Sequence, residues 1–297
     1  MKIINWIKNK IKIYILKLNY YMEILCRHYP KVLSDIETLD ILHNTNKSLV
    51  RFGDGEFEII QNKNIGFQNK NVHLANRLEE ILYSKKENVL IAIPRVTKIN
   101  NLNKVTNNSR EFWMQNFLEN KKIYIKLESN YIYYDASVSR PYIRYMQSEI
   151  SKKIFDMWKL IWENKNILIV EGASTCLGVG NNLFENANSI RRILCPEKNA
   201  YDKYKEIYEQ VKLVESVDLV LVALGPTATV LANDLADQMI RTIDIGHIDL
   251  EYEWFQKNCS ERVQIIGKFV NEIEGGDVVE DFNDSLYESQ IIAYITL

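Results

Sequence analysis

Two carboxylates separated by a single glycine follow the first strand that the sequence predicts. They lie in the run RFGDGE at residues 51–56, where Gly53 and Gly55 allow turn conformations closed to other residues. This spacing lets Asp54 and Glu56 point their oxygens at one cation, and such hard ligands suit Mg²⁺ or Mn²⁺ bridged to substrate phosphates. Arg51 could hold a phosphate oxygen or neutralise the carboxylates. The alternative is a tight turn in which Asp54 caps a helix that begins near Glu56.

A loop of small residues follows the strand expected at residues 166–170. It covers residues 171–182 and contains Gly178, Gly180 and Asn181. Where such a loop enters a helix, its backbone N–H groups can bind an anion such as phosphate. The loop matches neither the nucleoside-triphosphate loop nor the dinucleotide fingerprint. A phosphate cradle and a plain glycine-rich connection therefore both remain as interpretations.

Two further segments could contact a bound substrate. Gly225 and Thr227 follow the strand expected at residues 218–224, where Thr227 could cap the next helix and free N–H groups could meet phosphate or ribose oxygens. Helix capping alone would also explain them. Arg140 precedes a proline, and either a substrate contact or an ordinary surface loop accounts for it.

A histidine and three acids lie close together after the strand expected at residues 240–245. They are His247, Asp249, Glu251 and Glu253. A lone histidine is more often structural, and acids in a first helical turn often interact with the helix dipole. Together they exceed what a helix cap needs, so one of them is a candidate general base. We favour Glu251, with His247 and Asp249 as the alternatives.

These side chains need a scaffold that brings strand ends together. Short apolar, β-branched runs recur along the chain, as expected for strands buried on both faces of a parallel sheet. They are residues 48–52, 89–93, 122–127, 166–170, 190–194, 218–224 and 240–245. Helical spacing separates them at residues 74–82, 112–117, 142–162, 201–213 and 227–239. This alternation predicts a layered α/β fold with a mostly parallel sheet, in which ligands bind beyond the carboxyl ends of the strands.

Composition limits the classes of function. The chain has 297 residues, 46% of them hydrophobic, and a net charge of -2, which supports a folded core. Its 37 basic and 39 acidic residues create no basic field, so we expect no nucleic-acid partner. Its 4 cysteines form no CxxC pair and no secretory signal precedes them, which indicates reduced thiols in a cytoplasmic protein. Its 4 histidines have no zinc-site spacing.

Residues 1–20 alternate lysines with apolar residues, and the first acid is Glu23. This pattern predicts a basic amphipathic helix that ends before Pro30. Such a helix could contact the inner face of the cell membrane, or it could pack on the domain or on a second copy in a homodimer. We therefore expect residues 1–30 to be a helical extension and residues 31–297 to be one domain.

Several motifs resemble those of the bacterial GT-D glycosyltransferases. They are RFGDGEF at 51–57, SRPY at 139–142, VEGASTCLGVGNNLF at 170–184, ALGPTATVLANDLA at 223–236 and DIGHIDLEYEWF at 244–255. The resemblance implies a Rossmann-like fold, a UDP-sugar donor, and Mn²⁺ or Mg²⁺ held by Asp54 and Glu56. It also implies a role in building surface polysaccharide or glycosylated surface proteins.

On this basis we expect a metal-dependent hexosyltransferase that acts on a glycan acceptor carried by a lipid or a protein. A carboxylate base suits an inverting displacement. The residues expected on the donor side are Arg51, Gly53, Gly55, Arg140, Gly178, Gly180, Asn181, Gly225 and Thr227. The alternative is a non-catalytic nucleotide-sugar-binding subunit of a glycan-assembly complex, because a fold alone does not establish catalysis.

Overall fold

The computed structural model describes residues 2–103, 105–145, 148–270, 272–273, 275–276 and 284–297. Within these residues, nine strands form one sheet in the order β1-β4-β3-β2-β8-β7-β5-β6-β9, and every pairing is parallel. The strands are β1 (Lys31–Val32), β2 (Ser48–Arg51), β3 (Val89–Ile93), β4 (Ile132–Asp135), β5 (Asn166–Gly172), β6 (Ser189–Cys195), β7 (Leu219–Ala223), β8 (Thr242–Asp244) and β9 (Ile291–Tyr294). The predicted α/β fold with a parallel sheet is confirmed.

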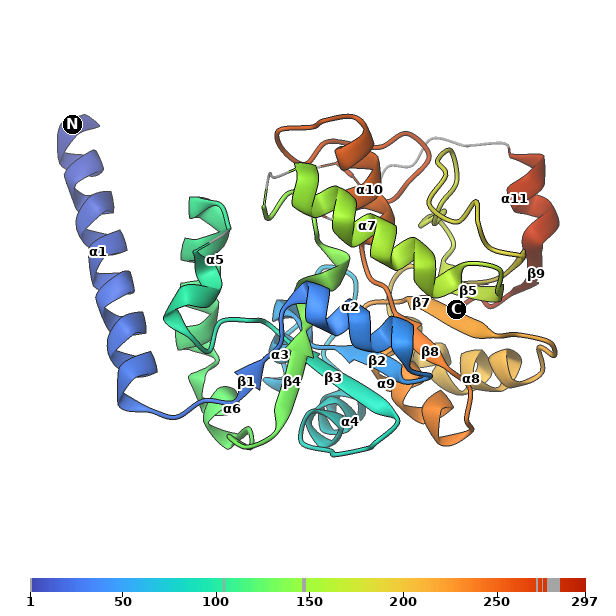
Figure 1. Cartoon of the computed structure of the whole chain (residues 1–297), viewed down its shortest axis with the longest axis horizontal. Helices are drawn as coiled ribbons and strands as arrows, with labels where there is room; N and C mark the ends of the chain where they lie inside the picture. Colours follow the sequence, from blue (N-terminus) through green and yellow to red (C-terminus); the bar gives the residue numbers. More distant parts are fainter. Residues whose placement is uncertain (1, 104, 146–147, 271, 274, 277–283) are drawn as a thin grey trace.

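Helices cover both faces of this sheet (Figure 1). One face carries α2 (Asp35–Asn44), α7 (Ser148–Trp162) and α10 (Ile248–Gln256). The other carries α3 (Asp54–Ile60), α4 (Val72–Leu82), α8 (Tyr204–Lys212) and α9 (Pro226–Asp237). The remaining helices are α1 (Lys2–Cys26), α5 (Asn107–Glu119), α6 (Lys121–Lys126) and α11 (Ser285–Gln290), with the short 3-10 helices η1 (Ile99–Leu102), η2 (Ala136–Ser139) and η3 (Ala200–Lys203).

Alternating side chains of the central strands fill the two layers. In β5, Ile167 and Ile169 pack with α7, whereas Leu168 and Val170 pack with α8 and α9. All four side chains are fully buried. Successive strand residues point to opposite faces, so a strand covered on both sides must be apolar throughout. This is why the apolar runs in the sequence indicate the central strands.

Six of the seven expected strands are confirmed, as β2, β3, β5, β6, β7 and β8. The strand expected at residues 122–127 is wrong, because this run forms α6 and continues to Leu127. Ile123, Tyr124 and Leu127 are buried, and Ile125 is exposed. That spacing is helical, and a short β-branched run does not separate the two alternatives. The short strands β1, β4 and β9 were not predicted.

Helix α1 projects from the edge of the molecule beside α5 (Figure 1). The buried Tyr20 attaches it, since its ring lies edge-on to Phe117 with 5.6 Å between centroids. The Tyr20 hydroxyl also donates a hydrogen bond to the Val96 carbonyl at 2.7 Å. Across the part of the chain that the structure describes, no helix is both long enough and apolar enough to cross a membrane.

Candidate active site

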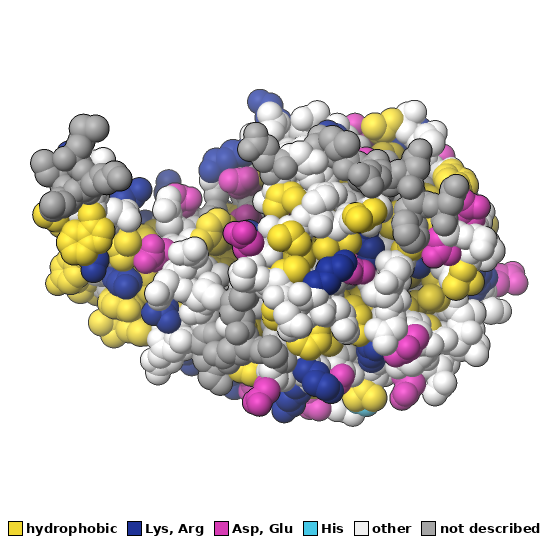
Figure 2. Space-filling view, turned by 90° about the horizontal axis from the view of Figure 1, so that it is seen from above, with side chains coloured by type: hydrophobic (Ala, Val, Ile, Leu, Met, Phe, Trp, Pro, Cys, Tyr) yellow, Lys and Arg dark blue, Asp and Glu magenta, His cyan; other side chains and the backbone are white. Residues whose placement is uncertain are grey.

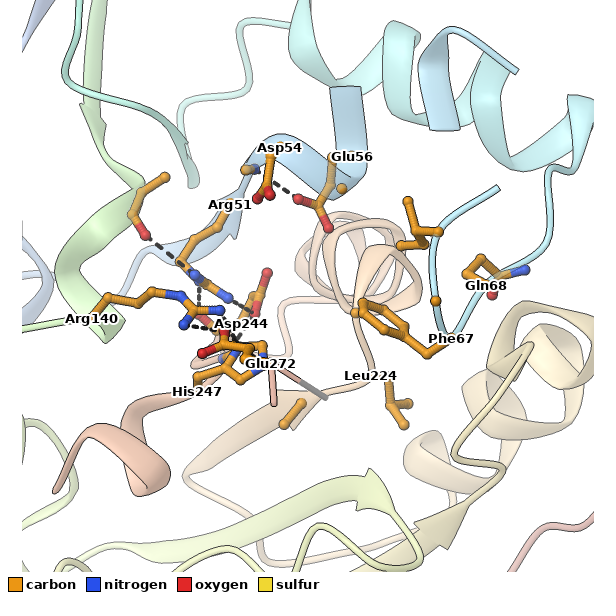
Figure 3. Close-up of a pocket in the computed structure, with 18 of the residues that line it drawn as sticks. Arg51, Asp54, Glu56, Phe67, Gln68, Arg140, Leu224, Asp244, His247 and Glu272 are labelled. Carbon is orange, nitrogen blue, oxygen red and sulfur yellow. Dashed lines mark hydrogen bonds and ion pairs between the residues drawn. The ribbon is translucent and has the colours of Figure 1, made fainter. Parts of the chain in front are cut away.

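A cavity of about 540 Å³ lies at the carboxyl edge of the central strands. Residues that end or follow each strand from β2 to β8 line it, and Figure 3 shows part of this wall. The expected site residues in the lining are Arg51, Gly53, Asp54, Gly55, Glu56, Arg140, Gly225, His247 and Asp249. The parallel sheet therefore brings residues of all four candidate loops into the cavity wall, because ligands bind beyond the carboxyl ends of such strands. In the loop after β5, however, the residues expected to bind the donor are not among those that line the cavity.

Asp54 and Glu56 extend from the start of α3 into this cavity (Figure 3). The N–H of Gly53 donates to Glu56 Oε2 at 2.7 Å, which fixes one oxygen of that carboxylate. Asp54 is exposed and forms no hydrogen bond or ion pair with any residue that the structure describes. Burial, reinforced by the nearby charge of Asp244, raises the pKa of Glu56 to about 7. A negative charge at Glu56 is therefore costly unless a cation neutralises it.

The donor set tests whether a metal ion fits these carboxylates. No group of three or more His, Cys, Asp or Glu side chains is placed to hold a metal ion in the described ranges. Asp54 and Glu56 can therefore supply only two protein carboxylates. Mg²⁺ commonly binds through one or two carboxylates and completes its shell with substrate phosphates and water. The residues fit an ion that shares its ligands with a bound diphosphate, and they do not form an all-protein cage.

Arg51, the last residue of β2, connects this strand to β8 and to the 3-10 helix η2 in the wall of the cavity. Its Nε donates to the Asp244 carbonyl at 2.9 Å, and its second terminal nitrogen donates to Asp244 Oδ1 at 2.7 Å. The other terminal nitrogen donates to Ser139 Oγ at 2.7 Å and to the Ala136 carbonyl at 3.2 Å. Most donors of the guanidinium are thus engaged by the protein. The main ion-pair partner of Arg51 is Asp244, which is neither Asp54 nor Glu56, so both roles considered for Arg51 stay predictions.

The close approach of Gly246 to Arg51 predicts a large effect of Gly246→Ala. A Cβ at Gly246 would lie 2.0 Å from a terminal nitrogen of Arg51, and its φ of +46° disfavours other residues. We expect the unfolding free energy to fall by about 2–4 kcal/mol, combining backbone strain with steric displacement. Gly180→Ala is the control, since Gly180 has φ +74° and a Cβ there would meet no atom within 4 Å. Equal losses in denaturant unfolding of both variants would contradict the clash.

His247 belongs to a charged cluster in the cavity wall (Figure 3). A terminal nitrogen of Arg140 donates to His247 Nδ1 at 3.0 Å, and Arg140 forms an ion pair with Glu272. Glu272 lies 3.7 Å from His247 Nε2 and pairs with Arg262 at 2.8 Å. Chiefly the positive charge of Arg140 holds the pKa of Glu272 down to about 2. Glu272 was not predicted, because it follows no strand and belongs to no recognisable motif.

Glu251 lies outside the cavity lining and is 1% exposed. Its Oε2 accepts the backbone N–H groups of Tyr142 and Ile143 at 2.8 and 2.9 Å. Burial raises its pKa. A carboxylate enclosed by backbone donors holds the turn after Arg140 in place. This placement weighs against the preference for Glu251 as the base, because a base must reach the acceptor hydroxyl.

Asp249 lines the cavity, but both of its oxygens are occupied. Oδ1 accepts the N–H of Gly178 at 2.9 Å and the amide of Asn181 at 2.8 Å. Oδ2 accepts the ammonium of Lys268 at 2.6 Å. The Asn181 amide also donates to Glu253 Oε1 at 2.7 Å. Asp249 and Glu253 therefore anchor the loop that follows β5.

The structure favours the glycine-rich connection over the phosphate cradle for residues 171–182. No helix follows β5 before β6 in the described chain. The N–H of Leu177 donates to Glu171 Oε2 at 2.7 Å, and that of Gly178 is bound to Asp249. Gly178, Gly180 and Asn181 lie outside the cavity lining. Donors that already serve buried carboxylates are not available to an anion.

The opposite end of the cavity is apolar and meets the start of α9. Phe67 and Leu224 line it beside Gly225, whose φ is +53°. A Cβ at Gly225 would lie 2.3 Å from the Phe67 ring, so only glycine permits this approach. The expected N-cap at Thr227 is wrong, because Gly225 is the N-cap and the Thr227 side chain is fully buried outside the lining. Phe67 was not predicted, since it lies in an irregular segment.

Comparisons with known proteins agree on one family. The family model for the glycosyltransferase GT-D fold matches residues 49–273. A protein named "Probable glycosyl transferase Gly" from Streptococcus gordonii is 37% identical over 263 residues, which cover 88% of this chain and 38% of that protein. "Glycosyltransferase GlyD" from Streptococcus pneumoniae is 35% identical over 260 residues, which cover 87% of this chain and 32% of that protein. The chain thus spans about a third of the length of these curated relatives.

Solved structures match the whole fold. One is described as a highly conserved domain of unknown function with a distinct glycosyltransferase fold. It is 36% identical, has a TM-score of 0.87, and the match covers 93% of this chain and 99% of that chain. Another, described as a new glycosyltransferase from Streptococcus sanguinis, is 37% identical with a TM-score of 0.83, covering 90% of this chain and 99% of that chain.

Proposed function

Because the chain belongs to the family of glycosyltransferases with the GT-D fold, we propose that it transfers a hexose from a UDP-sugar bound in the cavity to a glycan acceptor. One observation carries this proposal: a cavity of about 540 Å³ at the strand ends contains the two carboxylates Asp54 and Glu56. A cavity of this size falls in the range that encloses small ligands. The acceptor would belong to a surface polysaccharide or a glycoprotein under construction.

The polar end of the cavity would bind the diphosphate. Asp54 and Glu56 would hold a divalent ion, Mn²⁺ or Mg²⁺, that stabilises the negative charge developing on the leaving nucleotide. The Arg140 guanidinium lies near Asp54, so it can add positive charge at the same place. At the opposite, apolar end, Gly225 brings the amino end of α9 into the lining beside Phe67. Phe67 offers an apolar ring for the nucleoside.

His247 is the base that we propose for an inverting transfer. Its half-buried ring lines the cavity, whereas Glu251 does not reach it and Asp249 is held by three donors. The hydrogen bond from Arg140 to Nδ1 favours the tautomer with that nitrogen unprotonated. In this tautomer Nε2 carries the proton and lies near Glu272, so Nδ1 would accept the proton of the acceptor hydroxyl as that hydroxyl attacks the sugar, in place of the hydrogen bond from Arg140.

His247→Gln and Glu251→Gln separate the two candidate bases. We expect His247→Gln to lower kcat by about 10²-fold, the usual scale of general-base catalysis, with little change in donor binding. Glu251→Gln should lower the unfolding free energy by about 1–2 kcal/mol, because a neutral amide accepts backbone hydrogen bonds less strongly. Its kcat at a temperature where it stays folded should remain near that of the wild type. A folded Glu251→Gln protein with the larger loss of kcat would restore Glu251 as the base.

Product analysis tests the transfer itself. The purified chain is incubated with Mn²⁺, a panel of UDP-hexoses and glycan acceptors, and products are identified by mass spectrometry and by NMR of the anomeric proton. Free UDP together with an acceptor lengthened by one hexose, in the inverted configuration, is the expected result. UDP-sugar binding without turnover across the panel would instead indicate a binding subunit. Retention of configuration would overturn the assignment of a single base.

A further inference from the structure

Helix α1 has two apolar faces, and among the described residues only one of them packs on the rest of the protein. Tyr20, with Leu16 and Ile24, packs against the core beside α5. The opposite side carries a second apolar row, which we call the exposed stripe. Its members are Ile7, Ile11, Tyr14, Ile15, Leu18, Met22 and Leu25, each between 44% and 71% exposed. They recur every three or four residues, so they share one face of the helix.

The exposed stripe is too continuous to be incidental. Figure 2 shows hydrophobic side chains gathered over the projecting end of the molecule, with lysines among them. Single apolar residues are common on protein surfaces, whereas a contiguous row marks a contact that excludes water. The fold does not need this row, because the Tyr20 face alone attaches α1 to α5. The stripe is therefore a candidate contact surface for a partner.

Lysines border the stripe on both sides. With about 100° of rotation per residue, Lys8 and Lys12 lie along one edge and Lys10 and Lys17 along the other. Lys8, Lys10 and Lys12 are exposed. The Lys10 ammonium lies 4.6 Å from the ring centre of Trp6, which is itself 60% exposed. An apolar row between two rows of cations, with an aromatic ring beside one of the lysines, matches the boundary between acyl chains and anionic headgroups.

Charge argues against a second copy of the same helix as the occupant. Residues 1–22 contain no aspartate or glutamate. Pairing two copies of the stripe would bring lysine rows together without an acid to balance them, and flanking positions normally pair opposite charges in helix dimers. An anionic lipid surface supplies the missing negative charge over the whole length of the helix.

We propose that the exposed stripe of α1 docks the protein onto an anionic lipid surface. The helix would lie in the plane of the surface with the stripe among the headgroups and acyl chains. Helix α5 lies between α1 and the cavity, because Phe117 packs on Tyr20 of α1 and Trp113 of the same helix lines the cavity. Docking does not depend on the transfer reaction, so it can be measured without substrate.

Vesicle flotation with the full chain tests the docking. We expect binding to vesicles of phosphatidylcholine with about one third phosphatidylglycerol, weakened by salt, and little binding to phosphatidylcholine alone. The combined variant Lys8→Gln, Lys10→Gln and Lys12→Gln should lower the partition coefficient about 100-fold. Ile11→Ser with Leu18→Ser should lower it at least about tenfold. Thermal unfolding should be unchanged, since these side chains are exposed.

The matched control removes three lysines elsewhere. Lys152→Gln, Lys153→Gln and Lys205→Gln change the net charge equally on the exposed surfaces of α7 and α8, and this variant should bind vesicles nearly as well as the wild type. Equal binding to neutral and anionic vesicles would overturn the proposal, as would an equal loss in both lysine variants. A concentration-dependent dimer in sedimentation, abolished by Ile11→Ser with Leu18→Ser and accompanied by no vesicle binding, would assign the stripe to a second copy.

Discussion

Asp54→Asn is expected to abolish the Mn²⁺-dependent part of UDP binding and to reduce transfer by roughly 10²–10³-fold. The substitution removes one of two carboxylates in a site that has no third protein ligand among the described residues. An amide oxygen is neutral, so it cannot replace the charge that holds a divalent ion beside a diphosphate. Isothermal titration of UDP with and without Mn²⁺, followed by rate measurements with a UDP-sugar, checks the result.

The variant should fold as the wild type does. Asp54 is exposed, and among the described residues its only structural role is that of an acid in the first turn of α3, worth about 0.3–1 kcal/mol. Asp156→Asn provides the matched control, because it makes the same change at an exposed surface pair with Lys152 outside the cavity. If UDP binds the wild type and Asp54→Asn equally, whether or not Mn²⁺ is present, the turn is structural and the proposed metal role is lost.

The sequence predicts the centre of the sheet well and its margins poorly. Central strands such as β5 are covered on both faces, so each carries an uninterrupted apolar run that only burial explains. The margin depends on context that a local pattern does not contain. β1 has 2 residues, and the β-branched run at 122–127 forms a helix because its buried positions follow helical spacing against the core. Helix and strand have similar local propensity in this run, and packing against the core selects the helix.

The candidate site divides in the same way. Asp54 and Glu56 could be found from sequence, because both belong to one short turn at the end of a strand. The acids after β8 could also be found from sequence, but the hydrogen-bond donors that bind their carboxylates could not. Glu251 binds the N–H of Tyr142, which lies 109 positions away, and Asp249 binds that of Gly178 at a separation of 71. Through such long-range contacts a candidate base accepts hydrogen bonds from a distant part of the backbone. The local spacing of residues in the sequence does not reveal these contacts.

Arg192→Met is expected to lower the unfolding free energy by about 3–5 kcal/mol, the cost of leaving a buried charge without its partner. Glu171 is fully buried at the end of β5, and Arg192 of β6 donates to its Oε1 at 2.5 Å. The same guanidinium donates to the Leu177 carbonyl at 2.9 Å and to Gln290 Oε1 at 2.8 Å. One side chain therefore ties the loop after β5 to α11. Urea unfolding monitored by fluorescence measures the loss.

Two controls distinguish the effect of the unpaired Glu171 charge from the effect of lost packing around Arg192. Adding Glu171→Gln to Arg192→Met removes the carboxylate but keeps an acceptor for the Leu177 N–H, so the double variant should be more stable than the single one. Lys152→Met breaks the exposed pair with Asp156 and should cost less than about 1 kcal/mol. If the single and double variants are equally unstable, the charge of Glu171 is not the cause.

The pH dependence of the stability lost in Arg192→Met further tests whether the unpaired charge of Glu171 causes the loss. Burial already raises the pKa of Glu171 in the wild type, and losing the opposing charge of Arg192 must raise it further. A carboxyl whose folded pKa exceeds its unfolded value destabilises the protein fully above the folded pKa, and this penalty disappears below the unfolded pKa. The stability gap between Arg192→Met and the wild type should therefore narrow as the pH is lowered through the raised pKa of Glu171. A gap that stays constant with pH would mean that the arginine acts through its hydrogen bonds to Leu177 and Gln290 rather than through its charge.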